Sequence, residues 1–365
     1  MRQVYLGVDL HATKTLVHRV ERCADGKLVR TNGTYYTEEL DRLCRTLDKD
    51  TIVCVEASTG VFEFYDRISP FVKEVIIIHP RAFQGMYLSG KKTDKVDAKQ
   101  LANRLKAHIE DDDGKDDFPT VWVPPQYVRE LREMFSFLEL LKKEITMNKN
   151  KIRAMLRQHL IVLAEDADDI VIMEVGDFNV PESVRWMIRQ TQELLKSALQ
   201  TKKELEEKIR RTAVLYDAPT MKNLATIFGV SLMGVSAVLA DAGCIERFKT
   251  AKRFCRYMRS APRVEISNET IRIGSLDKAG RKTAFSYLVE GLRNIYTGNP
   301  HFQSFYDKKG TSKSKGKVRA ALIRKTLTAI YYMWKNREEY RWEHDEATTR
   351  KLKEIERIEK SVQAA

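Results

Sequence analysis

Short apolar runs separated by amphipathic segments mark the first third of the chain. The runs Val4–Asp9 and Thr15–Val20 flank the tetrapeptide HATK and predict a β-hairpin. Thr51–Glu56 and Val75–His79 are further apolar runs rich in β-branched residues, whereas Glu38–Leu47 has a helical pattern. Strands interleaved with helices predict an α/β domain with a mixed sheet covered by helices.

A heptad pattern follows a connector at residues 111–125, which is acidic and then proline-rich. Asn148 and His159 occupy the same stripe as the apolar residues. Polar residues in such a stripe commonly fix the register or the oligomeric state of a coiled coil. The apolar members recur every seven positions, with a second set three places later: Leu131, Leu138, Ile145 and Ile152, then Met134, Leu141 and Met155.

A second helical run has the same spacing and lies beyond the irregular segment 165–181. Two long helices in succession predict an antiparallel pair. The stripe fits either a spacer that packs on itself or a dimerisation and assembly arm, and its length and polar insertions favour the arm. The second run comprises Val184, Ile188, Leu195, Ala198, Leu205 and Ile209.

From Asn223 onward, short helical segments and a glycine-punctuated stretch predict a mainly α domain. Glycines and serines lie between many of the lysines near residue 310, which predicts a flexible cationic loop suited to phosphates, with a solvated face as the alternative. The basic residues are Lys308, Lys309, Lys313, Lys315, Lys317, Arg319, Arg324 and Lys325. We therefore divide the chain into 1–125, 126–215, 216–345 and a charged helical tail, 346–365.

Composition narrows the possible classes of function. The 365 residues exceed what one hydrophobic core usually supports. A net charge of +13 favours a polyanionic partner, and the lack of a long apolar run argues against a membrane span or a secretory signal. Five cysteines without a CxxC pair support neither a disulfide framework nor a zinc site. We expect a soluble protein of a reducing cytoplasm.

Four carboxylates form the strongest chemical signal. Asp9 and Glu56 close predicted strands, and Asp94 and Asp97 share a face at the start of a predicted helix. The helix pair alone could serve as capping residues. Four clustered anions would repel one another strongly without a cation, and hard oxygen ligands favour Mg²⁺ or Mn²⁺. Such a site can hold two metal ions for displacement at a phosphodiester.

Several segments together resemble the DEDD-type insertion-sequence transposases, relatives of the Piv-type DNA invertases, from about residue 4 to about residue 340. The most specific is KTDKVDA at residues 92–98, which follows HPR at residues 79–81. The others are GVDLHATK, VCVEAS, GVSLMGVSAVLADAG and SNETIRIGSLDKAGRK. The resemblance implies a RuvC-like, RNase H-like first domain whose acidic residues are Asp9, Glu56, Asp94 and Asp97.

The resemblance also implies a serine nucleophile, Ser267, which forms a covalent phosphoserine link to DNA. Asn268 stands where the family usually has glycine. The next serines to test are Ser58, Ser260 and Ser275. Implied nucleic-acid contacts are Lys92, Arg272, Lys278 and Arg281, together with the basic residues 308–319.

Residues 228–243 resemble a helix-hairpin-helix, although Ser231 and Leu232 replace the usual glycine and proline, and a packed helical hairpin is the alternative. The family implies donor and target DNA as partners and a structured guide RNA from the element. Because two duplexes with two cleavages each need four serines, we expect a homodimer that assembles to a homotetramer, acting at a prokaryotic nucleoid. The carboxylates and the serine could come from different protomers.

Two other function classes fit the same residues. One is a RuvC-like endonuclease or junction resolvase in which metal-activated water attacks the DNA, or a DNA invertase or resolvase that acts without a guide RNA. The other is an inactive binding module, against which the presence of all four acidic positions argues.

Overall fold

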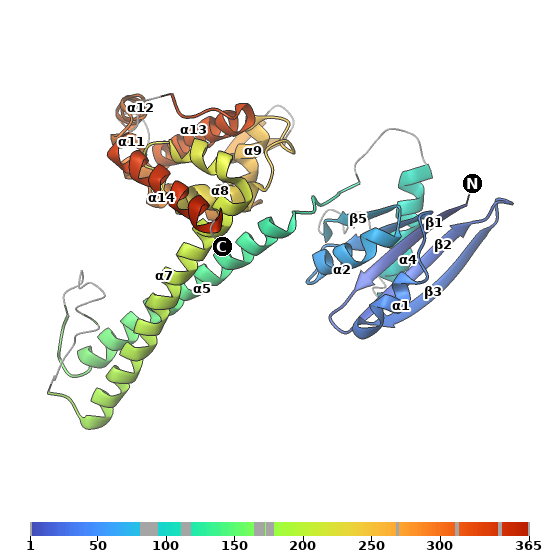
Figure 1. The fold of residues 1–365 in the computed structure, drawn as a ribbon, viewed down its shortest axis with the longest axis horizontal. Coiled ribbons are helices and arrows are strands. Elements are labelled where there is room, and N and C mark those ends of the chain that lie inside the picture. The colour runs from blue at the N-terminus through green and yellow to red at the C-terminus, as the bar shows by residue number, and fades with distance from the viewer. Residues whose placement is uncertain are drawn as a thin grey trace. The chain divides into compact units, whose positions relative to one another are not determined.

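The computed structural model of the chain describes residues 2–80, 94–110, 118–163, 172, 179–267, 270–310, 314–341 and 345–363. It divides into two compact units, Met1–Val123 and Pro124–Ala365 (Figure 1). No helix within these described ranges is long and apolar enough to cross a membrane.

The first unit contains a five-stranded mixed sheet with the order β3-β2-β1-β4-β5. β1 pairs antiparallel with β2 and parallel with β4, β3 pairs antiparallel with β2, and β5 pairs parallel with β4. The strands are β1 (Gln3–Leu10), β2 (Lys14–Arg22), β3 (Leu28–Tyr36), β4 (Thr51–Glu56) and β5 (Glu74–Ile78). The helices are η1 (Thr37–Glu39), α1 (Leu40–Cys44), α2 (Val61–Ile68), η2 (Ser69–Phe71) and α4 (Asp94–Glu110).

Different helices cover the two faces of this sheet, because side chains alternate along each strand. Leu6 and Val8 point toward the face that packs with α1 and α2. Tyr5 belongs to the other face, where Leu101 and Leu105 of α4 cover it. Figure 1 shows α2 and α4 on opposite sides of the strands. The fully apolar runs β4 and β5 are buried on both faces, as the sequence predicts.

Four strands are confirmed close to their predicted bounds, and β4 has the predicted bounds, Thr51–Glu56. β3 was missed because its sequence, LVRTNGTYY, lacks apolar alternation; it is a largely exposed edge strand. The helix predicted over Glu38–Leu47 is shorter and consists of η1 followed by α1.

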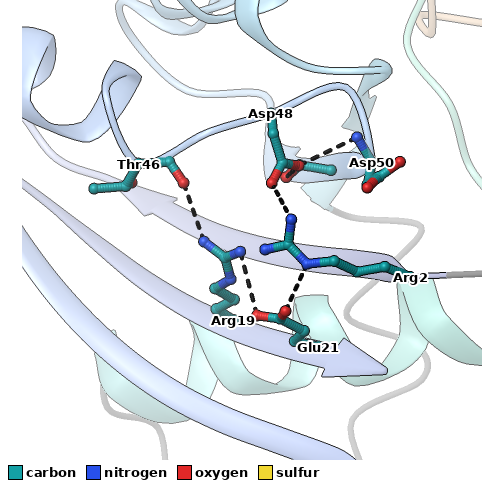
Figure 2. A network of polar contacts seen from close by, with 7 residues as sticks. Arg2, Arg19, Glu21, Thr46, Asp48 and Asp50 are labelled. Carbon is teal, nitrogen blue, oxygen red and sulfur yellow. Dashed lines mark hydrogen bonds and ion pairs between the residues drawn. The ribbon is translucent and has the colours of Figure 1, made fainter. Parts of the chain in front are cut away.

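Ion pairs hold the N-terminal ends of β1 and β4 (Figure 2). Arg2 contacts Glu21 of β2 through Nε and Asp48 through a terminal nitrogen, both at 2.7 Å. Arg19 donates to the carbonyl oxygen of Thr46 at 3.1 Å. The backbone N–H of Asp50 donates to Asp48, so the segment entering β4 is anchored to β2.

The second unit is built on two long helices, α5 (Gln126–Arg157) and α7 (Glu182–Ala225). Ile145 and Ile152 of α5 share a core with Ile188 and Leu195 of α7, while the beginning of α5 packs near the end of α7. The predicted antiparallel pair is therefore confirmed. Within one chain, the apolar stripe of α5 packs against the apolar stripe of α7.

The remaining elements surround a second core. α8 is buried along its whole length, and α14 packs Ile355 and Ile358 into the same core, so the predicted tail is a packed helix. The β6–β7 hairpin was not predicted as strands. These elements are α8 (Leu232–Ala242), α9 (Ala251–Tyr257), β6 (Pro262–Ser267), β7 (Thr270–Leu276), α10 (Thr283–Glu290), α11 (Leu292–Thr297), α12 (Pro300–Gly310), α13 (Lys315–Asn336) and α14 (Glu346–Gln363).

Candidate metal site and nucleophile

Asp9 and Glu56 lie at the carboxyl ends of adjacent parallel strands. Val8 pairs with Val55 in the parallel ladder, so Asp9 and Glu56 occupy the next position on each strand. Neighbouring strands lie about 4.8 Å apart. Asp9 follows Tyr5 by four residues and Glu56 follows Cys54 by two, which places both carboxylates on the face covered by α4.

The pKa of the Cys54 thiol agrees with Glu56 lying on the α4 face of the sheet. Burial raises its pKa, and the negative charge of Glu56 raises it further. Glu56 therefore lies close to the α4 face of β4.

α4 approaches β1 closely because residue 7 is glycine. A Cβ added at Gly7 would lie 2.1 Å from the Ala98 carbonyl oxygen and 2.4 Å from the Ala102 nitrogen. Only a residue without a side chain allows the helix backbone to rest directly on the strand. Gly7 lies two residues before Asp9 on the same face of β1, so this contact sets the distance between α4 and the sheet near the carboxylates.

The far end of α4 is fixed by Glu110. Its carboxylate accepts hydrogen bonds from the Tyr5 hydroxyl at 3.1 Å, from Arg22 at 2.7 Å and from Lys106. Burial would raise the pKa of Glu110, but these three donors outweigh it and lower the pKa. Burial and the bond to Glu110 raise the pKa of Tyr5 to about 12. α4 is thus held against the sheet near its start, at Ala98 and Ala102, and at its last residue, Glu110.

Asp97 lies in the first turn of α4, immediately before Ala98, and its Oδ1 atom is buried. Because Ala98 and Leu101 face the sheet, Asp97 lies on the side of the helix that overlies the strand ends. Asp94 is the first residue of α4. Its side chain and Lys92 lie outside the described residues.

His11 belongs to the same site, and the sequence reasoning missed it. Its Nε2 lies 3.1 Å from Oδ2 of Asp9, and the Asp9 side chain is only 20 % exposed. His11 lies in the tight β1–β2 turn, where its backbone N–H donates to the carbonyl oxygen of Lys14. The turn directs His11 back toward the end of β1. A histidine two residues after a strand-end carboxylate was the available signal.

The donor set fits a hard divalent cation. Asp9, Glu56 and Asp97 offer carboxylate oxygens on one face of the sheet, the ligand type that Mg²⁺ and Mn²⁺ prefer. Among the described residues, which exclude the Asp94 side chain, no group of three His, Cys, Asp or Glu side chains is arranged so that it could hold a metal ion.

Ser267 is the last residue of β6 and pairs with Thr270 across the hairpin end. Its side chain and Asn268 lie outside the described residues. Of the alternative serines, Ser260 is buried and donates its hydroxyl to the Cys255 carbonyl at 2.8 Å, so it is held in the fold. Ser58 and Ser275 are exposed.

Most of the predicted phosphate-binding residues are solvent-facing. The β7 residue Arg272 and the loop residue Lys278 are exposed, while Arg281 contacts the buried Asp241 at 2.8 Å. Lys313 lies outside the described residues. Exposed cations flank the loop between α12 and α13: Lys308, Lys309, Lys315, Lys317 and Arg319.

The α7–α8 turn lies in the segment 228–243, where a helix-hairpin-helix is expected, and it does join two helices. Every residue of α8 is buried, and the Ser231 side chain accepts the backbone N–H of Gly234 at 3.1 Å. One N–H of the helix start is therefore capped from within the chain, and phosphate binding at this turn stays a prediction.

Comparison with known proteins covers both units. Residues 6–161, which include the four acidic positions, match the family model of a DEDD transposase domain of IS110 type. Residues 221–307, which include Ser267, match the "Transposase IS116/IS110/IS902 family". A curated protein of Sinorhizobium fredii (strain NBRC 101917 / NGR234), "Putative transposase y4pF/y4sB", is 25 % identical over 312 residues, which are 82 % of this chain and 76 % of that protein.

The two family models match different parts of the chain in the order in which the acidic positions and the serine occur, and the relative spans both parts. The chain belongs to the IS110-type, DEDD-domain transposases and is a DNA transposase of a mobile insertion sequence.

Proposed function

We propose that the chain cuts and rejoins DNA through a covalent phosphoserine intermediate that depends on Mg²⁺, or on Mn²⁺ in its place. The observation that supports this most is the meeting of Asp9 and Glu56 on adjacent strand ends beneath the first turn of α4, which carries Asp97. Carboxylates at two strand ends, under a helix whose first turn carries Asp97, agree with an RNase H-like (RuvC-like) first unit, which we also propose.

Asp9, Glu56, Asp94 and Asp97 would hold the cation. When bound, it supplies positive charge that stabilises the negative charge developing on an attacked phosphate. The close contact at Gly7 and the bonds of Glu110 fix α4 on the sheet near both ends of the helix, which supports a role for this helix in presenting its carboxylates to the cation.

Ser267 would be the nucleophile. Its Oγ forms a bond to the phosphorus while the bond from phosphorus to one deoxyribose oxygen breaks. The serine proton leaves, and the released deoxyribose oxygen gains a proton. The phosphodiester is conserved as a phosphoserine ester, so a second DNA end can reverse the step and be joined without another energy source.

Donor and target DNA, guided by a structured RNA, would be the partners. A cluster of exposed cations flanks the α12–α13 loop, an arrangement suited to nucleic-acid backbones rather than base edges. RNA pairing would then supply sequence specificity, as in other guided systems. Four serines for two duplexes support a homotetramer built from dimers.

A denaturing gel with end-labelled element-junction DNA and guide RNA tests the chemistry. In Mg²⁺, wild type should yield protein-linked DNA, and a chelator should abolish it. Ser267→Ala should lose the adduct at least 100-fold, whereas Ser275→Ala, the matched change on the partner strand of the hairpin, should retain it.

Asp9→Asn and Asp97→Asn should also lose the adduct at least 100-fold. Cleavage with free ends by Ser267→Ala at the wild-type rate would replace this proposal with a metal-dependent endonuclease that uses water. Full activity of both carboxylate variants would exclude the metal site.

A further inference from the structure

A groove of about 790 Å³ runs along α5 within the second unit. One wall is α5 between Arg132 and Lys143, which spans about 16 Å of helix. The other wall is Arg259 with residues 280–283, the segment that enters α10.

The groove is strongly basic. Two acidic residues, Glu133 and Glu139, line the α5 wall. Five cations outnumber them, and they come from both walls: Arg132, Lys143, Arg259, Arg281 and Lys282. A lining with this excess of positive charge is complementary to a polyanion.

Its arginines are held in place by the fold. Asp241 is fully buried. Its carboxylate accepts hydrogen bonds from Nε of Arg281 and from the backbone N–H of Ala284, both at 2.8 Å. Arg132 donates to the carbonyl oxygens of Ala240 at 2.8 Å and Asp241 at 3.1 Å. The two guanidinium groups are therefore fixed before any ligand arrives, which lowers the entropic cost of binding.

These two guanidinium groups also lie close enough to repel each other. Burial and, after it, the positive charge of Arg281 lower the pKa of Arg132 to about 10. The carboxylate of Asp241 offsets part of this repulsion, and a phosphate bound beside the two guanidinium groups would offset more of it.

Apolar side chains accompany the cations. Phe137 and Leu140 line the same groove and are 46 % and 57 % exposed. An exposed aromatic ring beside backbone-binding cations is the arrangement on which unpaired bases stack. Bases in a duplex are stacked on their neighbours and do not present a free face.

We propose that this groove binds a single-stranded stretch of nucleic acid, with a phosphate at Arg132 and Arg281 and an unpaired base on Phe137. This inference rests on the proposed function only in taking a nucleic acid as the substrate. Its occupant is a strand opened during recombination or a loop of RNA, which share the phosphodiester backbone and an unpaired base.

Fluorescence anisotropy of the full-length protein tests the groove, with labelled twelve-nucleotide dT and U strands and a duplex of the same length. A chelator in the buffer separates binding from cleavage. Phe137→Ala should weaken single-strand binding roughly tenfold, and Phe137→Leu should weaken it nearly as much, because stacking needs the ring. Neither should change duplex binding.

The double variant Lys143→Gln, Lys282→Gln should weaken single-strand binding by about tenfold and make its salt dependence shallower by about 0.7 per lost phosphate contact. Lys151→Gln, an exposed α5 lysine outside the groove, is the matched control and should bind within about twofold of wild type. Tighter binding of dT indicates a DNA occupant, and tighter binding of U indicates RNA.

Unchanged single-strand binding by both groove variants overturns the inference, as does a loss confined to the duplex. Asp9→Asn should bind like wild type in this assay. If the groove variants bind normally, the proposed cleavage chemistry is therefore unaffected. If the cleavage test fails, the proposed binding groove is likewise unaffected.

Discussion

At Glu110, three donors converge on one carboxylate at the end of α4 opposite the acidic site. Its lowered pKa means that the folded protein holds the carboxylate charged more readily than the unfolded chain does. The stabilisation is therefore fully present above the ordinary pKa of 4.5 and is lost as the pH falls through the lower folded value.

Glu110→Gln should lower the free energy of unfolding by about 2 kcal/mol at pH 7, because the Tyr5 and Arg22 bonds lose their charged acceptor. The difference from wild type should shrink steadily below pH 4.5. Urea unfolding from pH 7 to pH 3 measures it, with the exposed Glu38→Gln as control. A difference that does not change with pH would show that the charge of Glu110 does not stabilise the fold.

The acidic residues could be placed from the sequence to different degrees. Asp9 and Glu56 were found because each ends an apolar run, and parallel strands end at a common edge. His11 was missed, since its contact with Asp9 depends on the geometry of a turn that no apolar pattern encodes. Ser267 rests on the family resemblance, because nothing in its local pattern separates it from a turn residue.

At the scale of elements, apolar content decided what could be predicted. β1, β4 and β5 are buried, so their sequences are continuous apolar runs. β3 is an edge strand with a polar sequence and lacks this signal. The β6–β7 hairpin has no continuous apolar run, but PRVEIS and TIRIGSL alternate apolar and polar residues, a strand signal that the sequence prediction did not use. The heptad pattern predicted an antiparallel pair of helices. It did not show whether the apolar stripes pack within one chain or against a second chain.

The contact of α4 with β1 gives an element-scale prediction. Gly7→Ala should lower the free energy of unfolding by about 2–3 kcal/mol and move α4 away from Asp9, because the new methyl group overlaps the α4 backbone. DNA cleavage should fall more than tenfold. Gly316→Ala, at a glycine with nothing within 4 Å, is the control and should leave both quantities unchanged or slightly improved.

Retained cleavage by folded Gly7→Ala protein would show that the close approach of α4 does not position the carboxylates. Denaturant unfolding establishes folding independently, so loss of structure is not mistaken for loss of the site.

Asn148 gives a second prediction for an element. Its side chain is buried in the α5–α7 seam, and within the described residues its Nδ2 has no hydrogen-bond partner. Asn148→Leu should raise the free energy of unfolding by about 1 kcal/mol, because a buried amide without a partner costs that much or more. Asn150→Leu, at an exposed position two residues away, should change it by less than about 0.5 kcal/mol. A destabilised Asn148→Leu would show that the amide is satisfied, for example by another protomer.

At the scale of the whole molecule, the proposed reaction needs residues from both units. If carboxylates and serine act from different protomers, assembly controls cutting. Mixing Asp97→Asn with Ser267→Ala should then restore adduct formation to about a quarter or more of wild type, measured on a denaturing gel. Two inactive proteins that stay inactive when mixed would place both groups in one protomer.

The central claim is that DNA becomes attached to Ser267. Its most direct test is mass spectrometry of the protein trapped with Mg²⁺, guide RNA and junction DNA, after digestion with nuclease and protease. The account predicts one nucleotide-bearing peptide, modified at Ser267, and none from Asp9→Asn protein. A nucleotide on Ser58 or Ser275, or cleaved DNA with no modified peptide at all, would contradict it.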